Sequence, residues 1–562
     1  MKAVLIIPPI YYPCVYHIAV PLLAGQLQAE NIETLCIDAN IGLFNFILNA
    51  QNAEKQKENI TSSSEIIKDF GRYINLAVNL TRDKNEFYSI KSLEKSFKLL
   101  DLLFEAYCRK FPDFKWSFYP QNRNMDSKWH SFEYLDKNID SEFFFDEYYR
   151  ELIKKIEPEK PDLIGISFSY LEQIIPGLKA AYLLKKSLNS KIVFGGNHIS
   201  RIIEELPNKE ILFKRYCDFF IKDDGERALV ELCSYLDNKI PIDDVSNLIY
   251  FKDGRLISNY KKRVSAKLVK PVNLKGFNFK DYFIPEIVSP VKLSRGCYYN
   301  KCAFCSHAPD VFYSVRDMNS IIDEIKYHVS LGISKFYITD EAVSPNLLER
   351  FADALIQNNL DIKYMIYARF EKEFSRKLLE KAYKSGLRMV LWGFETASRR
   401  IHKLMNKGDA FEKRYEILKN AYDCGIFNHL FIFHGFPSSK LDDEMKTLEF
   451  IDKNSKILGS FPAYVYFTLD KGSIIEQNLQ KFGITELKHI NASDFRFKNY
   501  AFDGNVLSSF DAEKINETEE RIIRSKYNSN FAALLERELM FLYICHYGAK
   551  NIKKFISCDI KK

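Results

Sequence analysis

The sequence predicts an α/β protein: an N-terminal Rossmann-like doubly wound sheet, then a partial (β/α)6 barrel, then a helical C-terminal extension. Short apolar runs typical of buried strands alternate with stretches of helical apolar spacing, in two successive parts of the chain. Small or polar residues follow several of these runs, as they do at strand ends where parallel sheets bind ligands. Three closely spaced cysteines follow the first apolar run of the second part. These observations predict two ligand-binding sheets in one chain.

Length and composition limit the classes of protein to which the chain can belong. Its 562 residues exceed what one hydrophobic core supports, so two to four domains are expected. Apolar residues make up 46% and charged residues 28%, as in a globular protein that dissolves in water. The uncharged stretch 3–29 contains several prolines and His17, and it lacks a signal-peptide cleavage pattern. We therefore expect neither a membrane span nor a secretion signal there.

Charge and cysteine content indicate which partners and which cellular compartment to expect. The net charge is +7, with basic and acidic residues interspersed, so the composition does not predict nucleic-acid binding. The eleven cysteines are scattered and odd in number, which does not suggest a disulfide framework. We expect a cytoplasmic protein whose cysteines stay reduced.

The first sheet is expected within residues 1–250. A helical insertion, at about 43–150, is rich in Phe, Tyr, Lys and Asn and contains the helical stretch 92–110. The other expected helices are 19–30, 174–188 and 227–236. The expected strands are 4–7, 33–38, 162–169, 191–194, 219–222 and a hairpin at 249–256. Residues 251–284 are interpreted as a linker.

The barrel is expected at 285–479, followed by the extension 480–562, interpreted as mostly helical. Its first strand, at about 291–293, precedes the cysteines. Four further strands are expected at 335–339, 363–368, 389–393 and 429–434, and a sixth at 463–468. The helices between them are expected at 320–331, 346–357, 375–385 and 413–424. Five or six units make a partial barrel rather than a full eight.

The three cysteines are the most informative motif. Cys297, Cys302 and Cys305 have the spacing C-x4-C-x2-C, and the next cysteine along the chain is Cys424. Three thiolates can hold three corners of a four-iron cluster and leave one iron open to a ligand. A structural zinc site that adds His307 is the alternative, although one residue between Cys305 and His307 is cramped for tetrahedral ligation. Incidental thiols are a third interpretation.

With this motif at the first strand of a β/α barrel, the sequence resembles the radical S-adenosylmethionine superfamily. The resemblance implies a [4Fe–4S] cluster held by the three cysteines, with S-adenosylmethionine chelated to the open iron. One-electron reduction then splits the sulfonium and yields a 5′-deoxyadenosyl radical. The common family pattern has three residues between the first two cysteines, whereas this sequence has four, which we interpret as a one-residue insertion.

The resemblance also implies roles for residues at successive strand ends. Phe304 corresponds to the aromatic residue that packs near the adenine. Asp340 and Glu341 correspond to an acidic motif near the methionyl amine, and Arg369 to a partner of the methionyl carboxylate. Glu395 and Thr396 resemble a Gly-x-Glu-Ser motif for ribose and methionyl binding. Gly435-Phe436-Pro437 resembles the family's Gly-x-Pro turn.

Residues 1–42 and about 155–240 resemble the cobalamin-binding domain fused to many radical S-adenosylmethionine enzymes. The contacts that this implies are Ser167, Ser169, Gly195, Gly196 and Asn197, with His198 interpreted as a polar loop residue. The sequence has no Asp-x-His-x-x-Gly motif, which many radical members also lack. Asp223 stands where the usual Gly-Glu-Gly-Glu pattern has its first glycine. The alternative is a sheet of this kind without a cofactor.

Three functions follow as hypotheses. The first is a cobalamin-dependent methyltransferase that acts on an unactivated carbon of a natural product or peptide. The second keeps the cluster but catalyses rearrangement, cyclisation or epimerisation. The third is a zinc-stapled, non-enzymatic binding protein. The expected partners are a small-molecule or peptide substrate and an electron donor such as flavodoxin or ferredoxin. The insertion and the C-terminal extension are expected to shape the substrate pocket.

Overall fold

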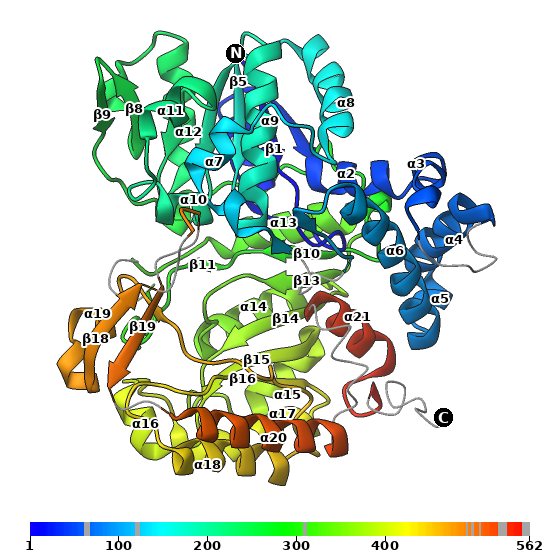
Figure 1. Ribbon diagram of the computed structural model, residues 1–562. Coiled ribbons are helices and arrows are strands. Elements are labelled where there is room, and N and C mark those ends of the chain that lie inside the picture. Colours follow the sequence, from blue (N-terminus) through cyan, green and yellow to red (C-terminus); the bar gives the residue numbers. More distant parts are fainter. Residues whose placement is uncertain are drawn as a thin grey trace. The chain divides into compact units, whose positions relative to one another are not determined.

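A computed structural model describes residues 1–60, 68–118, 124–306, 312–489, 493–495, 499–504, 507–526 and 537–552. The chain forms two compact units (Figure 1). The first unit comprises residues 1–264, 268–287 and 491–497, and the second comprises 265–267, 288–490 and 498–562. The two units are described separately.

The first unit is built on a seven-stranded sheet. Its strands, in spatial order, are β2 (Glu33–Asp38), β1 (Lys2–Ile7), β5 (Leu163–Ser167), β6 (Lys191–Gly195), β7 (Phe219–Ile221), β8 (Leu248–Lys252) and β9 (Arg255–Ser258). The first five are parallel, and β8 and β9 form an antiparallel hairpin at one edge. This order confirms the predicted doubly wound sheet, and it places the point where the strand order reverses between β1 and β5.

The parallel strands are buried on both faces, which explains their continuous apolar runs. All five residues of β5 are buried, as are all but the first of β1. The helices α1 (Ala19–Ala29), α9 (Ile174–Ser187) and α12 (Gly225–Leu236) follow β1, β5 and β7 in the chain. Leu5, Ala24, Val193 and Leu232 belong to one apolar core made by strands and helices together.

The insertion is mainly helical, as predicted. Its elements are α2 (Ala39–Ile47), α3 (Ala50–Lys55), α4 (Phe70–Arg82), α5 (Lys84–Phe87), α6 (Ile90–Lys110), the ribbon β3 (Phe114–Lys115) with β4 (Asn124–Met125), α7 (Phe132–Lys137) and α8 (Asp146–Ile156). Lys179 of α9 holds the C-terminal part of the insertion in place, because its buried Nζ donates to the carbonyl oxygens of Ile139 (2.6 Å) and Ser141 (3.0 Å). Asp146 Oδ2 lies 3.1 Å from the same ammonium group, so the buried charge is paired.

The second unit is built on a five-stranded parallel sheet. Its strands, in spatial order, are β10 (Val288–Val291), β13 (Lys335–Ile338), β14 (Lys363–Ala368), β15 (Leu387–Glu395) and β16 (Phe427–Ile432). The sixth expected strand, 463–468, does not form a full strand. It contributes the isolated parallel bridge between Tyr466 and His434, next to the one that joins Ser460 and His429.

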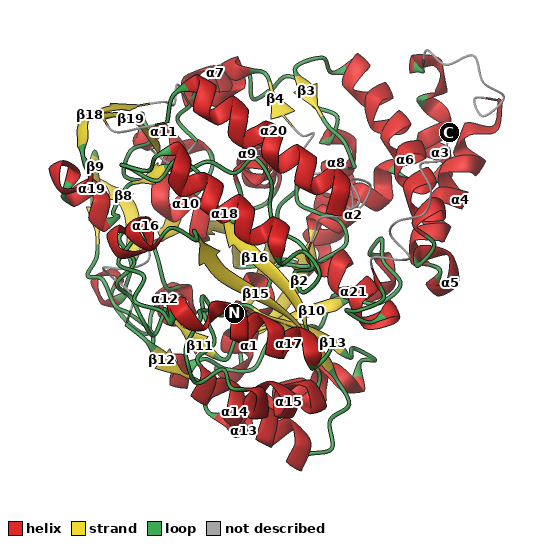
Figure 2. Ribbon diagram, turned by 90° about the horizontal axis from the view of Figure 1, so that it is seen from below, coloured by secondary structure: helices red, strands yellow, loops and turns green. Residues whose placement is uncertain are grey.

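Helices alternate with these strands. They are α13 (Met318–Ser330), α14 (Pro345–Gln357), α15 (Arg376–Ser385), α16 (Arg399–Leu404), α17 (Arg414–Asp423) and α18 (Leu441–Lys453). Figure 2 shows α13, α14 and α15 next to one another. Ser344 and Ser375 cap the first turns of α14 and α15 through their hydroxyl groups, and Gly386 ends α15 with a φ of 117°.

The described residues of the C-terminal extension are mostly helical, in α20 (Ser509–Lys526) and α21 (Arg537–Tyr547). The extension also contains two strands that were not predicted, β18 (Ile484–His489) and β19 (Asn499–Gly504), and the short helix α19 (Ile474–Gln477) precedes it. These two strands form a three-stranded antiparallel sheet with β17 (Leu469–Asp470). The strand β18 has the sequence Ile-Thr-Glu-Leu-Lys-His, which lacks the apolar–polar alternation of a half-buried strand, so the sequence does not distinguish it from irregular structure.

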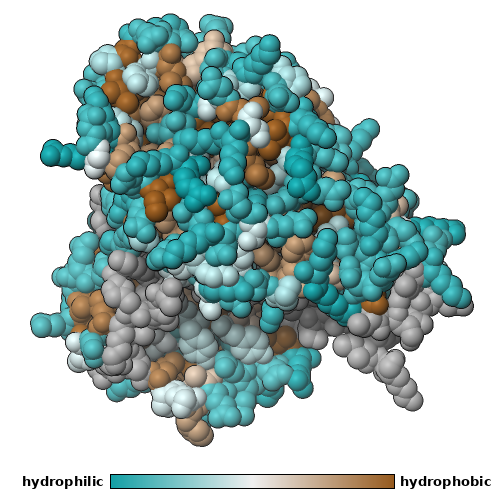
Figure 3. Space-filling view, turned by 45° about the horizontal axis from the view of Figure 1, so that its top comes forward, coloured by the Kyte–Doolittle hydropathy of each residue, from teal (hydrophilic) through white to brown (hydrophobic). Residues whose placement is uncertain are grey.

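On the face seen in Figure 3, the hydrophobic residues that the structure describes are scattered among hydrophilic ones. In the described part of the chain, no helix has both the length and the apolar character needed to cross a membrane.

Candidate functional site

The cysteine loop begins directly after the first strand of the second sheet. Its base is closed by a short antiparallel ribbon, β11 (Ser294–Arg295) with β12 (Ser314–Val315). Gly296 has a φ of 78° at the point where the chain leaves this ribbon, a conformation that favours glycine. The ribbon holds Cys297, Cys302 and Cys305 at the carboxyl end of β10, where parallel barrels carry their active sites.

All three cysteines are half-buried, and none forms a disulfide. Within the described residues, no three His, Cys, Asp or Glu side chains are placed to hold one metal ion. A four-iron cluster makes a different demand, because each thiolate binds a separate iron atom. His307, the fourth ligand of the zinc interpretation, lies outside the described residues. Three thiols on one loop, none of them in a disulfide, are the donor set that a cluster with one open iron requires.

Arg369, which follows β14, lies beside the middle cysteine. Its Nη1 is 3.6 Å from the Cys302 sulfur, and its guanidinium carbon is 3.6 Å from the centre of the Tyr299 ring. Burial raises the pKa of the Cys302 thiol, while the positive charges of Lys407 and Arg369 oppose that rise. These two cations therefore favour the thiolate form, which is the form that binds iron.

The cysteine loop is held by residues Met405–Asp409, here called the bracing segment. The amide of Ala303 donates to Met405 O (2.8 Å), and Tyr299 Oη donates to Asn406 O (2.6 Å). Asn406 Nδ2 donates to Lys301 O (2.9 Å) in the reverse direction. Arg369 Nη2 also donates to Lys407 O (2.6 Å), so the bracing segment, Arg369 and the cysteine loop form one connected structure.

A buried ion pair joins the bracing segment to the end of β15. Lys407 Nζ lies 2.8 Å from Glu395 Oε1, and both side chains are at most 10% exposed. Glu395 has a φ of 60°, an unusual backbone conformation for a residue with a side chain, and such strain is concentrated at functional sites. Lys407 Nζ also lies 6.0 Å from the centre of the Phe304 ring, which packs edge-on against Phe433 at 5.3 Å. This places Phe304, Glu395 and Lys407 together.

Asp340 is fully buried at the end of β13 and faces the start of the cysteine loop. Its carboxylate accepts hydrogen bonds from the amide of Leu293 (2.8 Å) and from the Ser294 hydroxyl. Burial raises its pKa to about 7, although these two hydrogen bonds oppose the rise. Glu341, the neighbouring residue in the predicted acidic motif, is exposed. Asp340 is thus committed to positioning the cysteine loop.

Thr396 is buried beside Glu395 and belongs to a network behind the site. Its hydroxyl accepts from the Ser398 amide (3.0 Å), and its carbonyl accepts from Arg414 Nη1 (2.7 Å). Arg414 also pairs with Asp409, the last residue of the bracing segment, at 2.8 Å. Thr396 therefore connects the end of β15 to the bracing segment rather than presenting its hydroxyl to a ligand.

The cobalamin contacts implied by the sequence lie at the carboxyl edge of the first sheet. Ser167 is buried, Ser169 and the two glycines are half-buried, and Asn197 is exposed. The hydroxyl of Ser169 lies 3.3 Å from His17 Nδ1. Gly196 has a φ of 110°, and a Cβ there would lie 2.3 Å from Phe168 O. Gly196 is therefore required by the turn itself, whereas a Cβ on Gly195 would meet only Ile221 O at 3.4 Å.

Two further residues of this edge have structural explanations. Asp223, at the place of the usual glycine, has a φ of 66°, so the turn keeps the left-handed conformation that a glycine adopts. His198 is buried, and its Nε2 lies 2.7 Å from Phe495 O. Burial lowers the pKa of His198, so the ring is neutral at neutral pH. Where β1, β5 and β6 end, the edge presents mainly neutral groups, and Tyr11 stacks on Tyr170 with ring centres 4.5 Å apart. Charged residues stand at its flanks: β2 ends in Asp38, and Lys222 and Asp223 follow β7.

Residues 291–451 match the family model of the radical SAM superfamily. The segment that carries the three cysteines therefore belongs to the radical SAM superfamily, and the protein is a radical SAM enzyme. This leaves the interpretation as a zinc-stapled, non-enzymatic protein without support.

The relatives and solved structures are distant. An uncharacterized methyltransferase of Pyrococcus horikoshii is 24% identical over 317 residues, which cover 54% of this chain and 67% of that protein. The bacteriochlorophyllide d C-12(1)-methyltransferase of Chlorobaculum tepidum is 27% identical over 197 residues, covering 32% and 41%. The structure of the cobalamin-dependent S-adenosylmethionine radical enzyme OxsB, with aqua-cobalamin and S-adenosylmethionine bound, has a TM-score of 0.62 at 14% identity and covers 97% of this chain and 70% of that chain. This likeness confirms the predicted fold class.

The main residue that the sequence analysis missed is Lys407. It follows α16, twelve positions after Glu395, in the run Asn-Lys-Gly-Asp, whose composition indicates only a loop. The sequence predicts site residues at the ends of strands. Lys407 is not at a strand end: it follows α16, where the chain comes back to the cysteine loop. No local signal distinguishes it from a solvated lysine.

Proposed function

We propose that the protein is a cobalamin-dependent radical SAM methyltransferase that methylates an unactivated carbon of a natural product or peptide. The observation that carries the proposal is the pairing, within one chain, of two different sheet edges. One edge holds three cysteines among buried charges, and the other, where β1, β5 and β6 end, is mainly neutral and rich in glycine and tyrosine. The first suits a cluster and a charged cosubstrate, and the second suits a neutral, amide-rich macrocycle.

Cys297, Cys302 and Cys305 would hold the cluster, which supplies the electron that cleaves S-adenosylmethionine. Arg369 and Lys407 would offset the negative charge of the thiolates, because both cations act on Cys302. The Tyr299 ring covers one face of the guanidinium and keeps Arg369 in place.

The Lys407–Glu395 pair matches the methionyl group of S-adenosylmethionine. That group is a zwitterion, with an ammonium and a carboxylate on one carbon atom. We infer that the methionyl group replaces the contact between Lys407 and Glu395. Lys407 Nζ then binds the methionyl carboxylate, and Glu395 Oε1 accepts a hydrogen bond from the methionyl ammonium. Because the protein already buries one positive and one negative charge here, a zwitterion adds no net charge to the site. Arg369, already engaged by Glu371 at 3.0 Å, would orient the loop.

Cobalamin, when bound, would supply the methyl group. The residues that we assign to it are Ser169 and Asn197 with the backbone of Gly195 and Gly196, at the edge where β5 and β6 end. The alternative, radical rearrangement, cyclisation or epimerisation without methyl transfer, remains the second candidate, because it needs only the cluster edge. A reductant such as flavodoxin or ferredoxin would deliver the electron in either case.

The test uses protein reconstituted anaerobically with iron and sulfide, then incubated with dithionite and S-adenosylmethionine. We expect 5′-deoxyadenosine from the wild type and none from Cys302→Ala, while Cys424→Ala, a cysteine away from the loop, behaves as the wild type. S-adenosylhomocysteine formed in the presence of added cob(I)alamin, which can accept the methyl group of S-adenosylmethionine, supports methyl transfer. Production of 5′-deoxyadenosine alone, without a corrinoid spectrum in the purified protein, contradicts the cobalamin part and favours the second candidate.

A further inference from the structure

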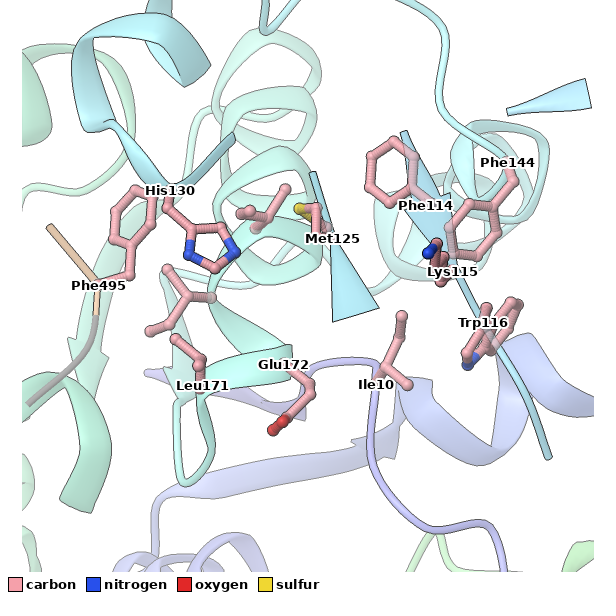
Figure 4. A pocket seen from close by; sticks show the side chains of 12 residues that line it. Ile10, Phe114, Lys115, Trp116, Met125, His130, Phe144, Leu171, Glu172 and Phe495 are labelled. Carbon is pink, nitrogen blue, oxygen red and sulfur yellow. The ribbon is translucent and has the colours of Figure 1, made fainter. Parts of the chain in front are cut away.

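The first unit contains a pocket outside the residues assigned to either cofactor. It lies where the loops after β1 and β5 meet the insertion, and it has a volume of about 80 Å³, enough for several water molecules. Figure 4 shows side chains from these elements turned toward one another around it. Its lining includes Ile10, Phe114, Trp116, Phe144, Leu171 and Phe495.

The interior of the pocket is mainly apolar, and its polar lining groups are the half-buried His130, two exposed charged side chains and the indole nitrogen of Trp116. Phe114, Phe144 and Trp116 are at most 6% exposed, and the rings of Trp116 and Phe144 lie 4.6 Å apart. The charged side chains that also line the pocket, Lys115 and Glu172, are exposed. This is the usual composition of a small-molecule site: an apolar body with a few polar groups that fix orientation.

One polar atom of the lining lacks a partner. The indole nitrogen of Trp116 is buried, and among the described residues no acceptor lies within hydrogen-bonding distance of it, although the ring itself is packed on Phe44 and Phe104. In Figure 4 this nitrogen is on the side of the ring that faces Ile10. A buried N–H without an acceptor is costly, and buried tryptophans normally bond theirs. A bound molecule with an acceptor would remove that cost.

We propose that this pocket is a substrate subsite that receives an aromatic ring carrying a carbonyl-type acceptor, with the acceptor directed at the Trp116 N–H. The flat aromatic walls favour a ring over a bulky aliphatic group, because offset and edge-on ring contacts add to area burial. The assignment to substrate rests on the proposed function, whereas the binding chemistry does not. The volume excludes a corrin ring, and the insertion that supplies half of the lining residues is the part of the chain not needed for the sheet.

The experiment measures binding of two matched probes to the full-length protein by saturation-transfer NMR. Acetophenone carries the acceptor, and α-methylstyrene has the same shape without it. We expect saturable binding of both, with acetophenone about fivefold tighter, as one net hydrogen bond implies. Trp116→Phe should remove that difference and leave α-methylstyrene unchanged. Leu171→Trp, which fills the pocket from a half-buried position, should abolish both signals.

Leu256→Trp is the matched control, because Leu256 is 39% exposed on β9 and away from the pocket. Equal affinity of the two probes in the wild type, or binding that persists in Leu171→Trp, overturns the inference. Loss of probe binding on saturation with aquocobalamin also overturns it, since the pocket would then belong to the corrinoid. Because no turnover is involved, failure of the radical reaction leaves these results unchanged, and the reverse also holds.

Discussion

The carboxyl edges of the two sheets differ in the charge and the type of their residues. The second sheet ends in charged side chains that are buried and paired, such as Lys407 with Glu395 and His434 between two glutamates. Where β1, β5 and β6 end, the first sheet presents glycines, serines and stacked tyrosines, and its buried His198 meets a carbonyl oxygen instead of a carboxylate. The charged edge is specified by side chains and the neutral edge largely by backbone conformation. Substitutions should therefore act differently at the two edges.

The largest effect is expected at the charged edge, from Lys407→Met. This change leaves Glu395 buried without its partner, which costs about 3–5 kcal/mol of unfolding free energy. Adding Glu395→Gln removes the uncompensated charge and should restore much of that stability. Chemical denaturation of the single and double variants measures both quantities. A single variant as stable as the wild type would show that the pair is solvated in solution.

His434 of the charged edge and His198 of the neutral edge should make the unfolding free energy depend on pH in opposite directions. Burial alone would lower the pKa of His434, but its hydrogen bonds to Glu444 (2.9 Å) and Glu519 (3.0 Å) raise it to about 9. The stabilisation is complete below pH 6.5 and is lost as pH rises through 9, an effect of about 3 kcal/mol. The unfolding free energy between pH 6 and 10 should therefore fall in the wild type.

His434→Gln is the matched variant, and its unfolding free energy should fall less over the same range. For His198, whose pKa is lowered, the sign is opposite: its contribution is present above pH 6.5 and is lost as the solution is acidified. A wild-type profile that is flat from pH 6.5 to 9 would contradict the paired imidazolium.

At the neutral edge the expected effect is smaller and depends on backbone. Gly196→Ala introduces a Cβ at a φ of 110°, within 2.3 Å of Phe168 O, and should cost about 1–3 kcal/mol. Gly195→Ala, one position earlier, meets only Ile221 O at 3.4 Å and should cost much less. Thermal unfolding of the two alanine variants measures the difference. Equal losses would show that ligand access, not the turn, explains the glycine pair.

The smallest effect is expected from Asp223→Gly. The left-handed φ of 66° is mildly unfavourable for aspartate, whereas glycine adopts it freely but loses more entropy on folding. The two terms nearly cancel, so the unfolding free energy should change by less than about 0.5 kcal/mol. Cobalamin binding by the variant, followed by absorbance, should equal that of the wild type. Tighter binding would show that the Asp223 side chain obstructs the corrinoid.

The comparison also explains what the sequence could predict. The parallel strands could be predicted from the sequence, because burial on both faces requires continuous apolar runs such as Val4–Ile7 and Leu163–Ser167. The cysteine loop was found because its spacing is local. Asp340 and Arg369 were found because they stand at strand ends, but their partners, Leu293 and Cys302, are set by tertiary contacts.

The remaining features depend on distant parts of the chain. Lys407 reaches Glu395 only because the bracing segment returns to the cysteine loop, and nothing in Asn406–Asp409 signals that return. The pocket beside Trp116 needs Ile10, Phe144 and Phe495, which lie more than a hundred residues apart. The strand pair of the C-terminal extension was missed because its pattern is short and mixed.

The most direct test of the two-edge account is the cofactor content of protein purified and reconstituted without oxygen. Iron, acid-labile sulfide and corrinoid are measured per chain in one preparation. The account predicts about four iron and four sulfide atoms, together with one corrinoid. A colourless protein that holds zinc and no iron would contradict it at the charged edge, and a full cluster without any bound corrinoid would contradict it at the neutral edge.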